Sequence, residues 1–297
     1  MSLEFLADYE AIINENIKVN IDKIRDLDKS ESVILDGMEY ALLAGGKRIR
    51  PIFSLMGALI GGLDMKKVLD FATGIEFIHT YSLVHDDLPG MDDDDLRRGK
   101  PTCHVKYGVG EAILIGDSLL THGISLLLQP IDGVSIENQL KAAKLMINSI
   151  GLLGMIGGQA ADLVQEKSRQ GNIETLEYIH KHKTGKLLEG SLLSGAILAG
   201  ADKGVQDNLL DYGQGFGLVF QITDDILDLT SSVEELGKPI GSDLKNEKLT
   251  YPKLYGIDKA RQMAVDEISR CKEYVKEYGE YGNQLKELAD YLIERRK

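Results

Sequence analysis

The sequence predicts an all-α protein, and three features of the 297-residue chain support this prediction. Apolar residues recur every three or four positions, the spacing that places side chains on one face of a helix. Only six prolines occur, and none lies between Pro130 and Pro239, so a long segment is free of this helix breaker. Alternating apolar and polar runs joined by hairpin turns are missing from the sequence. We therefore expect a bundle of roughly ten helices.

The expected helices follow one another along the chain with short connections. The first has an apolar face that runs from Leu3 through Leu6, Tyr9 and Ile13 to Ile17. Glycine or proline ends the next two helices, because neither residue continues a helix well. The remaining expected ranges are 34–44 (before Gly45-Gly46), 67–88 (before Pro89-Gly90), 109–129, 136–157, 174–200 and 205–230.

Residues 109–127 and 187–199 are apolar on more than one side of the helix. Such helices are either buried in the centre of a protein or covered by a partner subunit. We expect a homodimer that covers them, and a large monomeric core is the alternative.

Composition restricts the class of protein. The formal net charge of −13 argues against binding nucleic acid or an anionic membrane through overall charge. Cys103 and Cys271 lie far apart without a C-x-x-C pair, so we expect neither a disulfide framework nor a thiolate zinc site. The sequence lacks a run of about 18 apolar residues and a signal peptide. We expect a cytoplasmic protein without a membrane span and, because no linker or repeat divides it, one domain over residues 1–297.

An acidic cluster lies near the end of the helix expected over residues 205–230. Asp224 and Asp228 are four positions apart, so their side chains share one helix face with Gln221, whereas Asp225 is turned away. The alternative, a solvated polar face, is disfavoured because the neighbouring side chains are mostly apolar. Buried carboxylates need compensating charge, which indicates a bound cation.

A second acidic cluster lies in the first third of the chain. Asp86 and Asp87 end the helix expected over residues 67–88, and the chain bends at Pro89-Gly90 before Asp92. For the run of aspartates at 92–95, the alternative to a metal site is a flexible acidic loop. Two carboxylate clusters that face each other would hold divalent cations, and oxygen ligands favour Mg²⁺ or Ca²⁺ over zinc.

Basic residues accompany both acidic clusters. Arg97-Arg98 could neutralise the aspartates, but guanidinium groups also suit phosphate in two-point contacts. The segment Gly-Gly-Lys-Arg-Ile-Arg-Pro at 45–51 places basic side chains after two glycines, an arrangement typical of anion sites and also of ordinary surface loops. Gly185 follows the basic residues 180–183 and indicates a break in the helix, which would expose the Lys183 and Thr184 carbonyls. Together these segments suggest that the bound metal ions contact phosphate groups of a ligand.

Several segments resemble the trans-isoprenyl diphosphate synthase family, in the order in which that family carries them. The resemblance covers almost the whole chain, and the combination of segments is highly specific. The matching segments are GGKRIRP (45–51), YSLVHDDLPGMDDDDLRRGKPTCH (81–104), GGQAADL (157–163), KTG (183–185), FQITDDILD (220–228) and GKPIGSDLKNEKLTYP (237–252).

The resemblance implies an isoprenoid synthase fold, with the helices around a central deep cavity. It also implies that the enzyme joins isopentenyl diphosphate head to tail to an allylic diphosphate, with Mg²⁺. Asp86 and Asp92 would hold two metal ions, and Asp224, assisted by Asp228, would hold a third. The metals with Arg97, Lys183 and Lys238 would bind the allylic diphosphate, and Lys47, Arg50, His79 and Arg98 would bind isopentenyl diphosphate. Lys183, Thr184 and Gln221 would face the developing carbocation.

The resemblance also bears on product length. Tyr81 and Ser82 lie five and four positions before Asp86, where the growing chain would meet the cavity floor. An aromatic residue there, with the two-residue insertion Pro89-Gly90, is similar to bacterial farnesyl diphosphate synthases, which favours a C15 product. A geranylgeranyl diphosphate synthase and a non-catalytic subunit of a heteromeric synthase are the alternatives. A terpene cyclase is disfavoured because such enzymes usually lack the basic residues that bind isopentenyl diphosphate, which Lys47, Arg50 and Arg98 would supply here. An acidic Ca²⁺-binding protein is disfavoured because the sequence lacks the EF-hand loop pattern.

Overall fold

The structure, a computed structural model, describes residues 3–27, 32–168, 172–230 and 249–294. Within these ranges the only strands are the two-residue pair β1 (Leu96–Arg97) and β2 (Lys100–Pro101), so the predicted all-α class is confirmed. A 3₁₀-helix, η1 (Met65–Val68), and a π-helix, η2 (His180–Gly185), complete the set. The α-helices are α1 (Glu4–Leu27), α2 (Val33–Leu42), α3 (Ile49–Ile60), α4 (Leu69–Asp86), α5 (Cys103–Tyr107), α6 (Val109–Leu128), α7 (Ile136–Ile150), α8 (Met155–Ser168), α9 (Ile173–Ile179), α10 (Lys186–Leu198), α11 (Lys203–Thr230), α14 (Tyr251–Tyr255), α15 (Ile257–Tyr274) and α16 (Gly279–Glu294).

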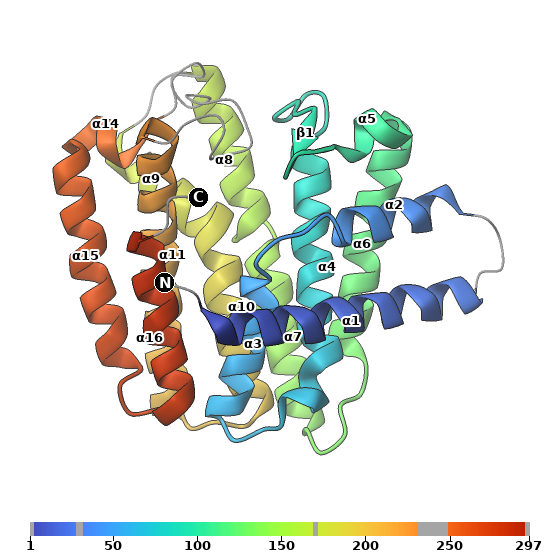
Figure 1. Ribbon diagram of the computed structural model, residues 1–297, viewed down its shortest axis with the longest axis horizontal. Helices are drawn as coiled ribbons and strands as arrows, with labels where there is room; N and C mark the ends of the chain where they lie inside the picture. The colour runs from blue at the N-terminus through green and yellow to red at the C-terminus, as the bar shows by residue number, and fades with distance from the viewer. Residues whose placement is uncertain (1–2, 28–31, 169–171, 231–248, 295–297) are drawn as a thin grey trace.

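The longer helices lie side by side, and α1 crosses in front of them (Figure 1). The helix α4 packs on α6, α3 packs on α10, and α11 packs between α10 and α15. A buried aromatic group joins α3 to α11, because the Phe53 ring lies 4.9 Å from that of Phe216 and 6.0 Å from that of Tyr212. The central helices α3, α4, α10 and α11 therefore form the framework of the core.

The helix expected over residues 109–129 is α6, within one residue at its end. The helix expected over 136–157 is instead divided into α7 and α8 by a turn at 151–154, a segment that begins and ends with glycine. The helix expected over 174–200 is interrupted by η2, at the break predicted around Gly185. More helices are present than expected, because α3, α5 and α14 to α16 were not assigned from the sequence.

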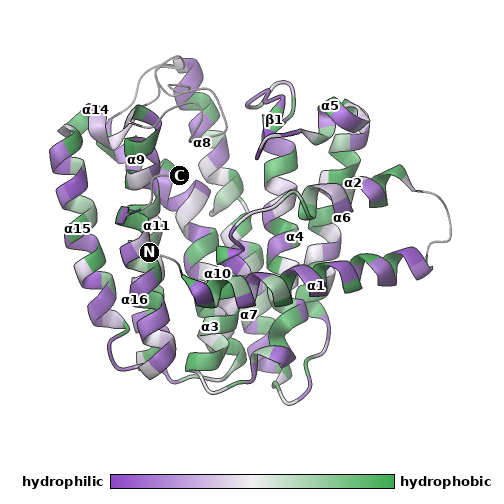
Figure 2. Ribbon diagram, in the orientation of Figure 1, coloured by the Kyte–Doolittle hydropathy of each residue, from purple (hydrophilic) through white to green (hydrophobic). Residues whose placement is uncertain are grey.

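Large apolar side chains are exposed on α6, α7 and α8, three consecutive helices of which each contacts the next. Leu114 is 54% exposed, Leu140 54% and Val164 66%, and Figure 2 shows apolar colour along much of α6. Two ranges, Val109–Leu128 and Ile136–Ser168, pass a length and hydropathy test for membrane spans. Core helices of globular proteins pass the same test, and the second range is broken by the turn at 151–154.

Candidate functional site

The first acidic cluster forms at the end of α4. Asp86 is the last residue of this helix, and the chain turns at Gly90, whose φ of 95° is readily adopted only by glycine. The backbone N–H of Asp92 then donates to the Asp86 carbonyl oxygen at 2.8 Å, so the chain returns to the end of α4 after the bend. Burial raises the pKa of Asp86 to about 6; the Lys183 ammonium opposes this shift and the Asp92 carboxylate adds to it.

Asp87 turns away from this turn and binds Arg97. The Arg97 Nε lies 2.9 Å from both carboxylate oxygens of Asp87, and Nη2 also donates to Oδ1. Asp87 is only 3% exposed, and burial raises its pKa although the guanidinium acts in the opposite direction. Asp87 therefore forms an ion pair with Arg97. The sequence alone left open which aspartate this arginine would neutralise.

The second acidic cluster lies on α11. Asp228 is 7% exposed, and its Oδ2 has no hydrogen-bond partner among the described residues. Asp225 serves a different purpose, because its Oδ2 accepts a hydrogen bond from the Tyr251 backbone N–H at 2.9 Å, and its Oδ1 lies 3.9 Å from the His180 Nε2. The expectation that Asp225 points away from the Asp224 and Asp228 face agrees with these contacts. The hydrogen bond from Tyr251 to Asp225 instead connects the start of α14 to α11.

The π-helix η2 brings Lys183 near the first acidic cluster, since its ammonium group acts to lower the pKa of Asp86. Lys183 Nζ lies 2.6 Å from Oδ2 of Asp162 on α8, an aspartate to which the sequence analysis gave no role. The helix α8 comes very close, since a Cβ on Gly158 would lie 2.1 Å from the Lys183 backbone nitrogen. Such π-helical turns often occur at functional sites. Gly213 and Gly217 of α11 allow similar close contact, with the backbone of Glu189 on α10 and of Gly185 in η2.

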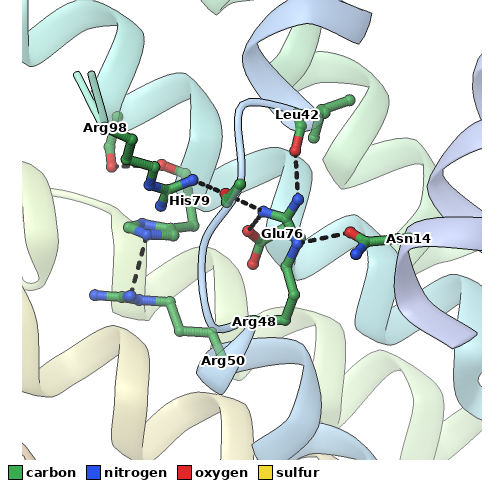
Figure 3. Close-up of polar contacts among 9 residues, drawn as sticks. Asn14, Leu42, Arg48, Arg50, Glu76, His79 and Arg98 are labelled. Carbon is green, nitrogen blue, oxygen red and sulfur yellow. Dashed lines mark hydrogen bonds and ion pairs between the residues drawn. The ribbon is translucent and has the colours of Figure 1, made fainter. Parts of the chain in front are cut away.

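Basic side chains from three segments gather beside α4 (Figure 3). Arg50 Nη1 lies 3.1 Å from Nε2 of His79, and an Arg98 guanidinium nitrogen donates to the Gly45 carbonyl. Lys47 Nζ lies 2.8 Å from the Tyr291 hydroxyl and over its ring. We call Lys47, Arg50, His79 and Arg98 the cationic cluster.

Burial has the largest effect on the pKa values of Arg50, His79 and Arg98. It lowers the pKa of Arg50 to about 10, and the carboxylates of Glu76 and Asp224 oppose this shift. It lowers the pKa of His79 well below its usual value, with Arg50 and Arg98 acting in the same direction. His79 is therefore neutral at pH 7, whereas the arginines stay charged and attract anions. The influence of Asp224 on Arg50 links this cluster to the second acidic cluster.

Two buried residues beside the cationic cluster were not predicted from the sequence. Arg48 and Glu76 form an ion pair at 2.7 Å, with side chains 2% and 3% exposed. Glu76 precedes His79 by three positions on α4 and so shares its helix face, and Arg48 lies within the basic segment 45–51; these were the signals available in the sequence.

The other predicted residues are placed as follows. Tyr81 is 6% exposed and its ring lies edge-on to that of His85 at 5.7 Å; Ser82 Oγ donates to the His79 carbonyl at 2.8 Å. Thr184 is buried in η2, and Gln221 lies half-buried on α11. Lys238 and most of the segment 237–252 lie outside the described residues.

The carboxylates suit a hard divalent cation. In the described ranges, no three His, Cys, Asp or Glu side chains are close enough to hold an ion unaided. Mg²⁺ usually binds one or two carboxylates, keeps several waters and takes phosphate oxygens as further ligands. Among the described residues Asp228 Oδ2 has no hydrogen-bond partner, and burial raises the pKa of Asp86, so a cation would stabilise both carboxylates in their charged form. These residues therefore fit Mg²⁺ that arrives with a phosphate group.

Comparison with known proteins agrees with this geometry. The model of the polyprenyl synthetase family matches residues 31–288. The chain is 42% identical to the farnesyl diphosphate synthase of Bacillus subtilis (strain 168), over 98% of this chain and 97% of the relative. It is 40% identical to the geranylgeranyl diphosphate synthase of Cyanophora paradoxa, over 99% and 96%. A solved FPP/GFPP synthase from Zymomonas mobilis superposes with a TM-score of 0.85 at 30% identity, covering 98% of this chain and 100% of the other. The chain belongs to the polyprenyl synthetase family and is a prenyltransferase.

Proposed function

We propose that this prenyltransferase condenses isopentenyl diphosphate head to tail with dimethylallyl and then geranyl diphosphate, releasing diphosphate and forming farnesyl diphosphate. The observation that carries this proposal is that each acidic cluster lies close enough to a basic side chain to affect it electrostatically. Lys183 acts electrostatically on Asp86, and Asp224 acts on Arg50 of the cationic cluster. Two anionic substrates with a metal between them would satisfy the charges of all these groups.

The residues divide between the two substrates in this proposal. Asp86, Asp92 and Asp224, with Asp228 in support, would hold Mg²⁺, which when bound would supply positive charge to the diphosphate leaving group. Arg97 and Lys183, with Lys238, bind the allylic diphosphate. When that substrate arrives, Lys183 exchanges its contact with Asp162 for phosphate oxygens.

The cationic cluster binds the diphosphate of isopentenyl diphosphate in this proposal. Its arginines supply paired N–H donors, which suit phosphate oxygens. Neutral His79 adds a ring nitrogen without further repulsion between cations. The cluster therefore places the second substrate beside the first.

Departure of the diphosphate leaves an allylic cation that needs stabilisation without a nucleophile. The carbonyl dipoles of Lys183 and Thr184 and the side-chain amide of Gln221 serve this purpose, because fixed dipoles aimed at developing charge lower the barrier. Apolar walls of the bundle keep water from the cation. The C3–C4 double bond of isopentenyl diphosphate attacks C1 of the allylic cation, which joins the two units and leaves a cation at C3. The C2 proton then leaves, a C2–C3 double bond forms, and the departed diphosphate accepts the proton.

Product length depends on Tyr81 in this proposal. Tyr81 lies more than one turn before Asp86 on α4, and its buried ring would stop the growing chain at C15. Relatives named for both farnesyl and geranylgeranyl diphosphate synthesis match the chain at similar identity. The aromatic side chain at position 81 supports the farnesyl product over the C20 alternative.

We also propose that the protein is a cytoplasmic homodimer with one catalytic domain per chain. The exposed apolar side chains of α6, α7 and α8 would be covered by the second copy and not by lipid. Sedimentation at low micromolar concentration, without detergent, should give about twice the chain mass of 32.7 kDa. A particle of one chain mass would contradict the dimer.

The function is tested by incubating the purified protein with dimethylallyl and isopentenyl diphosphates and Mg²⁺. Chromatography of the dephosphorylated products should show farnesol as the main alcohol. No Mg²⁺-dependent product would contradict the assignment as an active synthase, and geranylgeraniol as the main product would favour the C20 alternative.

A further inference from the structure

The buried ion pair of Arg48 and Glu76 lies beside Arg50, His79 and Arg98 of the cationic cluster (Figure 3). Its presence is not explained by stability, because a well-packed apolar pair of similar volume often stabilises a fold as well or better. Arg48 is also too deeply buried to reach a substrate, with 2% of its side chain exposed. A different role must account for two charges placed there.

Arg48 joins four segments through its guanidinium group. Besides the contact with Glu76 on α4, its Nε donates to Asn14 Oδ1 on α1 at 2.9 Å. Its Nη1 donates to the Gly45 carbonyl at 3.0 Å, and its Nη2 donates to the Leu42 carbonyl, at the end of α2, at 2.6 Å. These four contacts leave at most one of the five N–H donors of an arginine. Arg48 therefore acts as a fixed support and not as a ligand.

The backbone around Arg48 is held in an uncommon conformation. Arg48 itself has φ of 51°, and Gly45 and Gly46 have φ of 108° and 121°. A left-handed arginine persists only where its surroundings enforce it, and such residues concentrate at functional sites. Gly46 is favoured mainly by its φ, which other residues rarely adopt, and a Cβ there would also lie 2.6 Å from the Arg98 guanidinium nitrogens, so that this side chain would have to move. The loop between α2 and α3 is thus shaped around two arginines.

This loop carries or orients the arginines of the cationic cluster. Arg50 lies two positions after Arg48, at the start of α3. The Gly45 carbonyl accepts hydrogen bonds from both Arg48 and Arg98, so it links the support to a cluster member. A shift of Arg48 would therefore displace both Arg50 and Arg98.

Glu76 provides the matching contact on α4. It lies one turn before His79, and the His79 ring contacts Arg50 at 3.1 Å. Its carboxylate also opposes the effect of burial on Arg50 and Arg98, because it raises the pKa of both. Glu76 thus supplies negative charge for an otherwise cationic region, while Arg48 shields it from an incoming anion.

We infer that Arg48 and Glu76 are positioning residues for isopentenyl diphosphate: their ion pair locks the loop between α2 and α3 so that Lys47, Arg50 and Arg98 converge on one diphosphate. This inference rests on the proposed function, because it assigns the cationic cluster to isopentenyl diphosphate. It predicts that loss of the pair weakens binding of one substrate and spares the other.

The test compares Glu76→Gln and Arg48→Lys with the control Glu39→Gln. Glu39 makes the same type of ion pair, with Arg25 at 2.8 Å, but on the surface, where its side chain is 40% exposed. The dissociation constant of isopentenyl diphosphate is measured by calorimetry without an allylic substrate, and KM for geranyl diphosphate is measured by turnover. We expect both variants to weaken isopentenyl diphosphate binding about tenfold or more, with KM for geranyl diphosphate within about twofold of wild type. Glu39→Gln should change neither value.

Glu76→Gln could fail to fold, because removal of one partner of a buried ion pair is strongly destabilising. Asn14→Ala keeps the ion pair and removes one support of Arg48, so it should weaken isopentenyl diphosphate binding about threefold in a folded protein. Unchanged isopentenyl diphosphate binding in the folded variants, or an equal loss for both substrates, would overturn the inference. A wild-type protein that neither binds nor consumes isopentenyl diphosphate would instead overturn the proposed function.

Discussion

Replacing Asp86 by asparagine should stabilise the metal-free protein while it removes activity. Burial raises the pKa of this carboxyl from 3.8 to about 6. The folded state therefore keeps its proton to a higher pH than the unfolded state. By linkage, the free energy of unfolding falls as the pH rises from about 4 to about 6, and the loss is complete above that range.

The magnitude follows from the size of the shift. Each pKa unit corresponds to about 1.4 kcal/mol, so the ionised Asp86 costs the metal-free fold about 3 kcal/mol at pH 7.5. Asparagine is nearly the same size and carries no charge. Asp86→Asn should therefore raise the free energy of unfolding in EDTA at pH 7.5 by up to this amount. The gain should vanish below about pH 4, where aspartate is protonated in both states.

Urea unfolding in EDTA, at pH 7.5 and at pH 4, provides the assay, with turnover measured in Mg²⁺. Asp22→Asn makes the same change at an exposed position of α1 and should leave both properties unaltered. We expect Asp86→Asn to lower kcat by roughly a hundredfold or more, since it removes a group that stabilises transition-state charge. A variant that is less stable than wild type in EDTA at pH 7.5, or that turns over at a near-normal rate, would refute this reasoning.

Three further changes test separate parts of the site. Tyr81→Ala should move the main product beyond C15 in chromatography of the dephosphorylated alcohols, and an unchanged product would mean that this ring is not the floor. Asp87→Asn should raise KM for the allylic diphosphate about tenfold, because its arginine partner loses a charge-assisted contact; an unaltered KM would place that arginine outside the substrate site. Gly158→Ala should distort η2, since its Cβ would lie 2.1 Å from the Lys183 nitrogen, and should lower both kcat and the melting temperature. Gly110→Ala, whose Cβ meets nothing within 4 Å, is the control, and equal behaviour of the two variants would contradict the close approach.

The sequence predicted helices best where one long apolar pattern meets clear end signals. Residues 109–129 coincide almost completely with α6, and the bend after α4 occurs at Pro89-Gly90 as expected. The turn at 151–154 was missed because its two leucines continue the apolar pattern and conceal the effect of the glycines. The helices α15 and α16 carry many charged residues and a narrow apolar face, which is a weaker pattern.

The site residues that could be predicted from the sequence have a characteristic spacing along one helix or match a family segment. Asp224 and Asp228 are examples, since a four-residue interval sets their relative direction. Arg48 and Glu76 are 28 positions apart, and their contact depends on how α2, α3 and α4 pack. Asp162 likewise meets Lys183 only because α8 lies against η2. Arg48 and Asp162 lie within the segments 45–51 and 157–163, but the sequence does not show which residues they contact, because these contacts follow from tertiary packing.

The central claim is that cations bridge the carboxylates of α4 and α11 through a diphosphate. A crystal grown with Mn²⁺ in place of Mg²⁺ and a non-cleavable allylic diphosphate analogue tests it directly through anomalous scattering. We expect metal peaks about 2.2 Å from carboxylate oxygens of Asp86, Asp92 and Asp224, each shared with diphosphate oxygens. Diphosphate bound without metal at these aspartates, or metal bound elsewhere in the chain, would contradict the account.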